Sequence, residues 1–145
     1  MDKGIDPHEW LGQAKAELEV AKHLYEVFRP MPMEIICFHA QQAAEKAVKA
    51  VILYQAADSK MEKKHDVSVL LDRIDKDRAP FDAAFYEYAD ELFPYSVITR
   101  YPSQLQDNID ELRVKRALSY AGMVWKWANG AINATDSNDT GNGQQ

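Results

Sequence analysis

The apolar residues of this chain recur at the spacing of an α-helix, and prolines divide that pattern into separate segments. The first stripe runs through Trp10, Leu11, Ala14, Leu18, Ala21, Tyr25 and Phe28. Pro30 and Pro32 end it, because proline lacks an amide hydrogen and disfavours helix in the residue before it. The alternation typical of strands is scarce. The pattern therefore predicts an all-α protein, a bundle of helices.

Start and stop signals set the expected helix limits. Asp6, Pro7 and Glu9 form a capping box at the start of the first helix. The second helix is expected from about residue 33 to 57. A shorter helix follows Asp66 as its N-cap, and a fourth begins near Pro80. The last helix is expected from Asp107 to about residue 129.

This last helix carries two apolar stripes rather than one. The first contains Ile109, Leu112, Tyr120, Val124 and Trp127, and the second contains Val114, Leu118, Ala121, Trp125 and Ala128. A helix that is apolar on two sides is buried on two sides. In a bundle this small we expect a partner chain to cover the second stripe, which predicts a dimer.

Length and charge limit the function classes. The 145 residues suit one domain, and we expect a helical bundle over residues 1–132 with a disordered polar tail over residues 133–145. A net charge of −6 argues against a surface that covers nucleic acid by bulk electrostatics. Cys37 is the only cysteine, so no intrachain disulfide forms. No signal peptide or membrane span is recognisable, which predicts the cytoplasm.

The most informative polar residues lie in the second helix. At 3.6 residues per turn one face carries His39, Gln42, Lys46 and Lys49, with Glu45 at its edge. This face is either a pocket wall that contacts a phosphate or base, or a solvated face with a Glu45–Lys49 pair; the residues alone favour the solvated face.

Gln41 falls within the apolar stripe of the same helix. A buried glutamine requires hydrogen-bond partners, so we expect it to tie this helix to another part of the chain.

A second candidate lies in the irregular segment 94–106, where the helical period is lost. Thr99-Arg100-Tyr101-Pro102 presents an arginine that can bind phosphate beside a tyrosine that can stack a base. Arg100 can equally fold back onto Glu45 or an aspartate and hold the loop. His65-Asp66 reads better as a helix cap than as a general base.

The sequence contains neither metal-ligand spacing nor a glycine-rich phosphate loop, so no metal or cofactor is expected.

Taken together, the motifs resemble the HEPN family (higher eukaryote and prokaryote nucleotide-binding domain). The resemblance rests on Trp10-Leu11, the run from Cys37 to Lys46, His65-Asp66, and Thr99 to Pro102. It implies an up-and-down bundle of four to five helices, homodimeric, with a polar groove near the dimer interface. It also implies a prokaryotic setting beside a minimal nucleotidyltransferase, often as a toxin–antitoxin pair. Many family members are metal-independent RNA endonucleases, in which four to six residues separate an arginine from a following histidine.

That motif is absent here, because the places after Arg100 where the histidine would fall hold Leu105, Gln106 and Asp107. We therefore favour a non-catalytic nucleotide-binding or regulatory module over a purely structural partner. An RNase with a divergent site ranks third, using Arg100 and Tyr101 with His39 or His65 as base. The binding site would be formed by the following residues: His39, Gln42, Glu45, Lys46, Arg100 and Tyr101.

Overall fold

The described part of the chain forms five α-helices and one short 3₁₀ helix. The computed structural model describes residues 6–56, 66–97 and 109–144, with residues 134–144 described as backbone alone. The elements are α1 (Pro7–Val27), α2 (Met33–Gln55), α3 (Val67–Leu71), α4 (Ala84–Leu92), η1 (Phe93–Val97) and α5 (Glu111–Gln144). Within these ranges no strand occurs, so the expected all-α bundle is confirmed.

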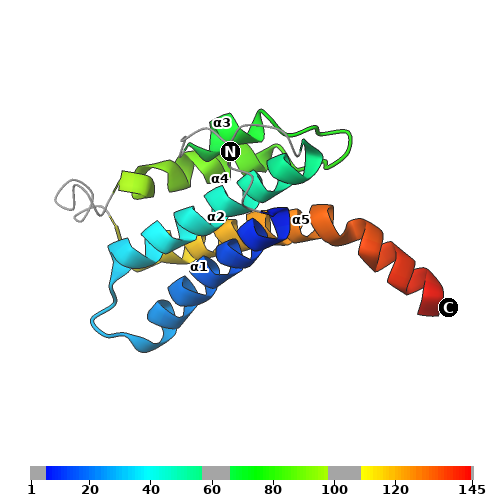
Figure 1. The fold of residues 1–145 in the computed structure, drawn as a ribbon. Coiled ribbons are helices and arrows are strands. Elements are labelled where there is room, and N and C mark those ends of the chain that lie inside the picture. Colours follow the sequence, from blue (N-terminus) through cyan, green and yellow to red (C-terminus); the bar gives the residue numbers. More distant parts are fainter. Residues whose placement is uncertain (1–5, 57–65, 98–108, 145) are drawn as a thin grey trace.

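Helix α2 is the central element of the bundle. It contacts α1, α3, α4, α5 and η1, and more than half of its residues are buried. In Figure 1 it runs through the middle of the molecule, with α1 and α5 on one side and α3 and α4 on the other. Five fully buried alanines, Ala40, Ala43, Ala44, Ala47 and Ala50, allow this close packing. The helix that carries most of the candidate site residues is therefore held in place by neighbouring elements on most of its sides.

Local signals place the first and third helices as expected. The Asp6 side chain accepts from the His8 amide at 2.8 Å, and Glu9 accepts from the Asp6 amide at 3.1 Å, so the predicted capping box is formed. Helix α1 ends at Val27, before Pro30. Asp66 caps α3 by accepting from the Ser68 amide at 3.0 Å.

Two helices begin later than their sequence signals suggested. Helix α4 begins at Ala84 rather than near Pro80, and Asp82 accepts from the Ala84 amide at 2.8 Å. Helix α5 begins at Glu111, and Asp110 accepts from the Arg113 amide at 2.9 Å. Asp107 lies outside the described residues. In both cases an aspartate that lies closer to the helix than the sequence signal provides a side-chain acceptor for the first turn.

Most of both apolar stripes of α5 is covered within one chain. Val114, Ala117 and Ala121 are fully buried in the core. On the other side the rings of Tyr88 and Tyr120 stack with their centroids 4.3 Å apart. The chain itself therefore supplies most of the cover that the sequence analysis had assigned to a partner.

The two tryptophans of the stripes are also held within the chain. Trp127 packs edge-on against Phe81 and Phe85 and donates to the Pro80 carbonyl at 3.0 Å. Trp125 donates to the Leu11 carbonyl at 3.2 Å. Among the large apolar side chains described on α5, Leu112 remains 61% exposed and Met123 remains 48% exposed.

The end of α5 extends past the bundle. Its backbone continues as helix beyond the predicted end near residue 129, as far as Gln144, and projects away from the other helices (Figure 1). Among the residues whose side chains are described, up to residue 133, Ile132 is the last one buried in the core. The division into a bundle over residues 1–132 and a disordered tail stays a prediction.

Candidate functional site

Along the side of α2 that faces α1 runs a narrow, half-buried polar strip. His39, Gln42 and Lys46 are half-buried, whereas their neighbours Ala40, Ala43 and Ala47 are fully buried. Because residues 39, 42 and 46 are separated by three and four positions, they line up along one side of the helix. This strip faces α1, the helix that packs beside it. We call the strip, together with the α1 residues beside it, the α1–α2 face.

Glu17 of α1 joins two of these side chains. Its Oε1 accepts from His39 Nδ1 at 2.6 Å, and its Oε2 accepts from Lys46 Nζ at 2.6 Å. The carboxylate side chain is only 19% exposed. Burial alone would raise the pKa of Glu17, but hydrogen bonds and charges from His39 and Lys46 outweigh burial and lower it below its ordinary value. Glu17 is therefore an ionised, doubly held carboxylate between the two helices.

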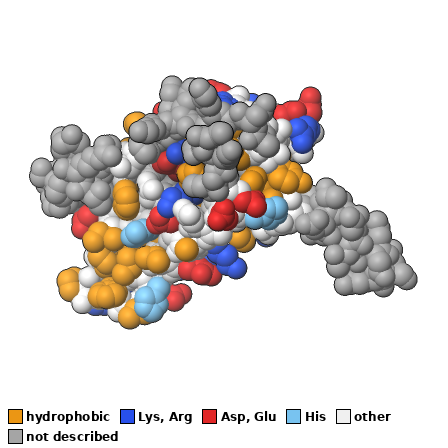
Figure 2. Space-filling view, viewed as in Figure 1, with side chains coloured by type: hydrophobic (Ala, Val, Ile, Leu, Met, Phe, Trp, Pro, Cys, Tyr) orange, Lys and Arg blue, Asp and Glu red, His pale blue; other side chains and the backbone are white. Residues whose placement is uncertain are grey.

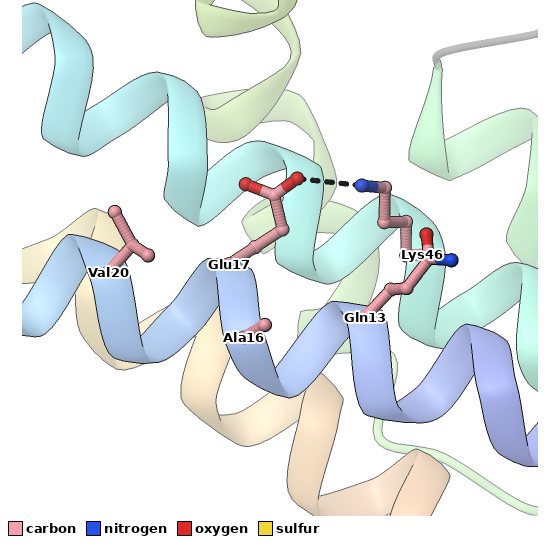
Figure 3. Close-up of a pocket in the computed structure, with 5 residues that line it drawn as sticks. All are labelled: Gln13, Ala16, Glu17, Val20 and Lys46. Carbon is pink, nitrogen blue, oxygen red and sulfur yellow. Dashed lines mark hydrogen bonds and ion pairs between the residues drawn. The ribbon is translucent and has the colours of Figure 1, made fainter.

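A small pocket lies over this carboxylate. It has a volume of about 290 Å³ and is lined by Gln13, Ala16, Glu17, Val20 and Lys46. In Figure 3 Lys46 reaches from α2 toward Glu17 on α1, and Gln13 lies one turn along α1. The pocket thus presents the amide of Gln13, the carboxylate of Glu17 and the ammonium of Lys46 around the small side chain of Ala16. Such a set can both donate and accept hydrogen bonds.

A chain of hydrogen bonds leads from this face into the core. Gln42 Nε2 donates to Gln41 Oε1 at 2.8 Å, and Gln41 Nε2 donates to Glu45 Oε1 at 3.0 Å. Lys49 Nζ donates to Glu45 Oε2 at 2.8 Å and lies 5.5 Å from the centre of the Trp10 ring. Gln41, Glu45 and Lys49 are 0%, 4% and 6% exposed. The inner part of the predicted polar face is therefore a buried network.

Two positions differ from the sequence-based expectation. The Glu45–Lys49 pair exists, but it is buried rather than solvated, because α2 is covered on most of its circumference. Lys49 therefore does not lie on the polar face with His39 and Lys46, where the sequence predicted it. Gln41 is buried, as its place in the apolar stripe indicated.

The remaining site predictions lie outside the part of the chain that is described. Arg100 and Tyr101 belong to the range 98–108, and His65 belongs to the range 57–65. The structure therefore brings together His39, Gln42 and Lys46, with Glu45 beneath them, and Arg100 and Tyr101 stay predictions.

Glu17 is not among the site residues predicted from the sequence. A signal was present, because Glu17 is three residues after Ala14 and four before Ala21, and both alanines are fully buried. A charged residue at that position of a helix lies at the border of the buried stripe. Such a residue requires a partner on the neighbouring helix. The polar residue types of the second helix supply that partner.

Two structural absences concern only the described ranges 6–56, 66–97 and 109–144. There, no group of three histidine, cysteine, aspartate or glutamate side chains is placed to hold a metal ion. Nor does any helix in this part of the chain combine the length and the apolar character that crossing a membrane requires.

The fold and the α1–α2 face define a class: a single helical bundle whose central helix presents a polar strip beside an acidic residue of the first helix. The HEPN domain model matches residues 7–131, which is most of the chain. This protein therefore belongs to the HEPN family.

Two crystal structures agree with the family assignment. TT1696 from Thermus thermophilus aligns with a TM-score of 0.74 at 25% identity, over 86% of this chain and 97% of that one. ST0689, an archaeal HEPN homologue, aligns with a TM-score of 0.69 at 25% identity, over 88% and 98% of the two chains. None of the curated proteins matches the chain.

Proposed function

We propose that this protein is a non-catalytic nucleotide-binding or regulatory HEPN module. The observation that carries the proposal is the Glu17–His39–Lys46 cluster beside the pocket that Gln13 and Val20 help to line. Glu17 and Lys46 line this pocket, and the imidazole of His39 holds the same carboxylate from the other side. The module would act as a homodimer with a minimal nucleotidyltransferase, as part of a toxin–antitoxin pair, which the family resemblance implies.

The chemistry of the face suits a nucleotide better than a bare phosphate. Glu17 neutralises much of the positive charge that a free anion would need, so inorganic phosphate is expected to bind weakly. A ribose supplies hydroxyl donors that a carboxylate accepts, as acidic residues do in dinucleotide-binding folds. The phosphates then lie toward Lys46, and the amides of Gln13 and Gln42 remain for the base. Arg100 and Tyr101 belong to the proposed site as phosphate and base contacts.

Thermal unfolding with a panel of nucleotides tests this proposal. Millimolar ATP or GTP is expected to raise the melting temperature, because a ligand that binds only the folded state stabilises it. Lys46→Gln and Arg100→Ala are expected to remove the shift, whereas Lys22→Gln, at an exposed position of α1, is expected to keep it. The absence of a shift with every nucleotide in the wild-type protein would overturn the proposal.

One observation favours a second candidate, a metal-independent RNase with a divergent site. The Glu17 carboxylate holds His39 through Nδ1, which leaves the other ring nitrogen as a possible proton acceptor. Carboxylate-oriented imidazoles serve as general bases in hydrolytic enzymes. If this function holds, labelled single-stranded RNA in EDTA is cleaved by the wild-type protein, and the products are missing with His39→Ala and with Arg100→Ala. If the RNA stays intact and no nucleotide stabilises the protein, a structural role as an interaction partner is left.

A further inference from the structure

The buried Glu45–Lys49 pair fixes the direction of the hydrogen bonds that lead from it to the surface of α2. Lys49 Nζ donates to Glu45 Oε2 at 2.8 Å, and a carboxylate paired with an ammonium can only accept hydrogen bonds. The Gln41 amide must therefore turn its nitrogen to the carboxylate, and Gln41 Nε2 donates to Glu45 Oε1 at 3.0 Å. The carbonyl oxygen of Gln41 is then left on the other side of its amide, where it accepts from Gln42 Nε2 at 2.8 Å.

Gln42 is the half-buried outer end of this hydrogen-bond chain. Its amide nitrogen is committed to Gln41, so the opposite side of the amide presents the carbonyl oxygen. A glutamine on an open surface can turn its amide over and offer either a donor or an acceptor. If Gln42 did so, its carbonyl oxygen would face the carbonyl oxygen of Gln41, and two acceptors cannot form a hydrogen bond. The fold therefore makes Gln42 a fixed acceptor.

The fixed acceptor lies beside the Glu17 carboxylate. His39 is three residues before Gln42 and Lys46 is four residues after it, so Gln42 lies between them on one side of α2. Glu17 contacts these two neighbours, His39 and Lys46, at 2.6 Å each. Gln13, the amide that lines the pocket from α1, is exposed and is free to turn over. Of the two amides on the α1–α2 face, Gln42 is thus the one whose direction the fold sets.

Charge does not distinguish one nucleotide from another on this face. Glu17 and Lys46 form an ion pair at 2.6 Å, and Figure 2 shows acidic and basic side chains beside one another over α1 and α2. Nucleotides carry the same ribose and phosphates whatever their base, so these charges treat them alike. Selectivity among bases has to come from hydrogen bonds to the base edge, where donors and acceptors differ.

We propose that Gln42 selects nucleotides whose base carries an exocyclic amino group, adenine or cytosine, over those with a keto oxygen at the same position, guanine or uracil. The amino groups of adenine and cytosine donate, whereas the keto oxygens only accept. An amino group forms a hydrogen bond with the Gln42 carbonyl, and a keto oxygen brings two acceptors into contact. Glu45 and Lys49 are positioning residues, because they set the direction of Gln42 through Gln41. This inference rests on the nucleotide binding of the proposed function.

Two pairs of nucleotides that exchange this group test the inference. ATP and ITP carry an amino group and a keto oxygen on the same purine position, and CTP and UTP do so on a pyrimidine. Calorimetric titration of the wild-type protein is expected to give a dissociation constant about tenfold lower for the amino member of each pair, because one mispaired polar contact costs about that much. Gln42→Met should bring both ratios to about one, since it removes the acceptor. Gln13→Met is the matched control and should leave both ratios unchanged.

A change at the buried end tests whether the direction is set from there. Glu45→Gln with Lys49→Met replaces the ion pair by an amide that can donate or accept, so the amides of Gln41 and Gln42 can turn over. Both ratios should again fall to about one, although the changed residues are buried beneath the face. Glu45→Asp keeps an acceptor-only carboxylate and should retain the preference. Thermal unfolding without nucleotide checks that each variant is folded, and Gln42→Met, at a half-buried position, tests the inference even if the double variant does not fold.

The contrary outcomes are distinct. If the wild-type protein binds both members of each pair equally, or prefers the keto bases, the inference is wrong and nucleotide binding stands. The same conclusion follows if the preference persists in Gln42→Met or in the folded double variant. If the wild-type protein binds none of the four nucleotides at millimolar concentration, the proposed function is wrong and the selectivity is overturned with it.

Discussion

Replacing Glu17 with glutamine removes one charge from the α1–α2 face while it keeps the shape of the side chain. In the native protein this carboxylate is held by His39 Nδ1 and by the Lys46 ammonium, each at 2.6 Å, and its side chain is 19% exposed. Exposed ion pairs contribute at most about 1 kcal/mol, whereas breaking a buried pair costs about 3 to 5 kcal/mol. The Glu17 pair lies between these limits, and the glutamine carbonyl still accepts one hydrogen bond. We expect a loss of about 1 to 2 kcal/mol in the free energy of unfolding at neutral pH.

The pH dependence separates the charge from simple packing. The pKa of Glu17 is lowered in the folded protein, so its contribution is complete above the unfolded-state value of 4.5. This contribution is lost as the pH falls through the lower folded value. Wild type and Glu17→Gln should therefore differ at pH 7 and approach each other near pH 3. A group that is merely packed would give the same difference at both values.

Urea unfolding followed by tryptophan fluorescence measures this difference, and thermal unfolding should show a decrease of about 2 to 8 °C for a chain of this size. Glu19→Gln is the matched control, because Glu19 is an exposed carboxylate on the same helix. A loss no larger than that of the control, or an equal loss at pH 7 and pH 3, would contradict the reasoning.

Three further predictions follow from the buried groups and the tail. Glu45→Ala should lower the free energy of unfolding by about 3 to 5 kcal/mol because it leaves Lys49 buried and charged, and a double-mutant cycle with Lys49→Met in urea should show strong coupling. Independent effects of the two changes would argue against the buried pair. Burial raises the pKa of Cys37 to about 12, so a thiol reagent at pH 8 should label it only in denaturant; rapid labelling of the native protein would show that the core opens there. A chain ended after residue 133 should keep its melting temperature, since the backbone of α5 beyond Ile132 projects away from the other helices, and a clear decrease would assign the tail a role in the fold.

The sequence predicted the helices whose ends are marked by local chemistry. The capping box at Asp6 and the prolines at 30 and 32 set α1, because the groups that start or stop the helix lie within a few residues of each other. The start of α5 was wrong, since more than one aspartate in the segment from 107 to 110 satisfies the cap rule. Asp110 is the aspartate that accepts from the first turn, and its neighbour Ile109 packs against the core. That packing is a tertiary contact, which a local sequence rule does not contain.

The site was only partly predictable for the same reason. The helical period of α2 predicted that His39, Gln42 and Lys46 share one face. It did not predict whether the polar residues on and beside that face are solvated or buried. Their burial depends on how much of α2 the neighbouring helices cover. In the structure this cover buries Glu45 and Lys49. Glu17 lies 22 residues before His39, and no local pattern joins the two. The double stripe of α5 indicated burial correctly, but the cover comes mainly from the chain itself, through Tyr88 and its neighbours.

Titration of the isotopically labelled protein with ATP, followed by amide resonances, tests the central claim most directly. Binding at the α1–α2 face predicts shifts that saturate and that cluster in residues 13–20 and 39–46, and Lys46→Gln should remove them. Unchanged spectra at millimolar ATP, or shifts confined to α4 and the end of α5, would contradict the assignment of this face as the nucleotide site.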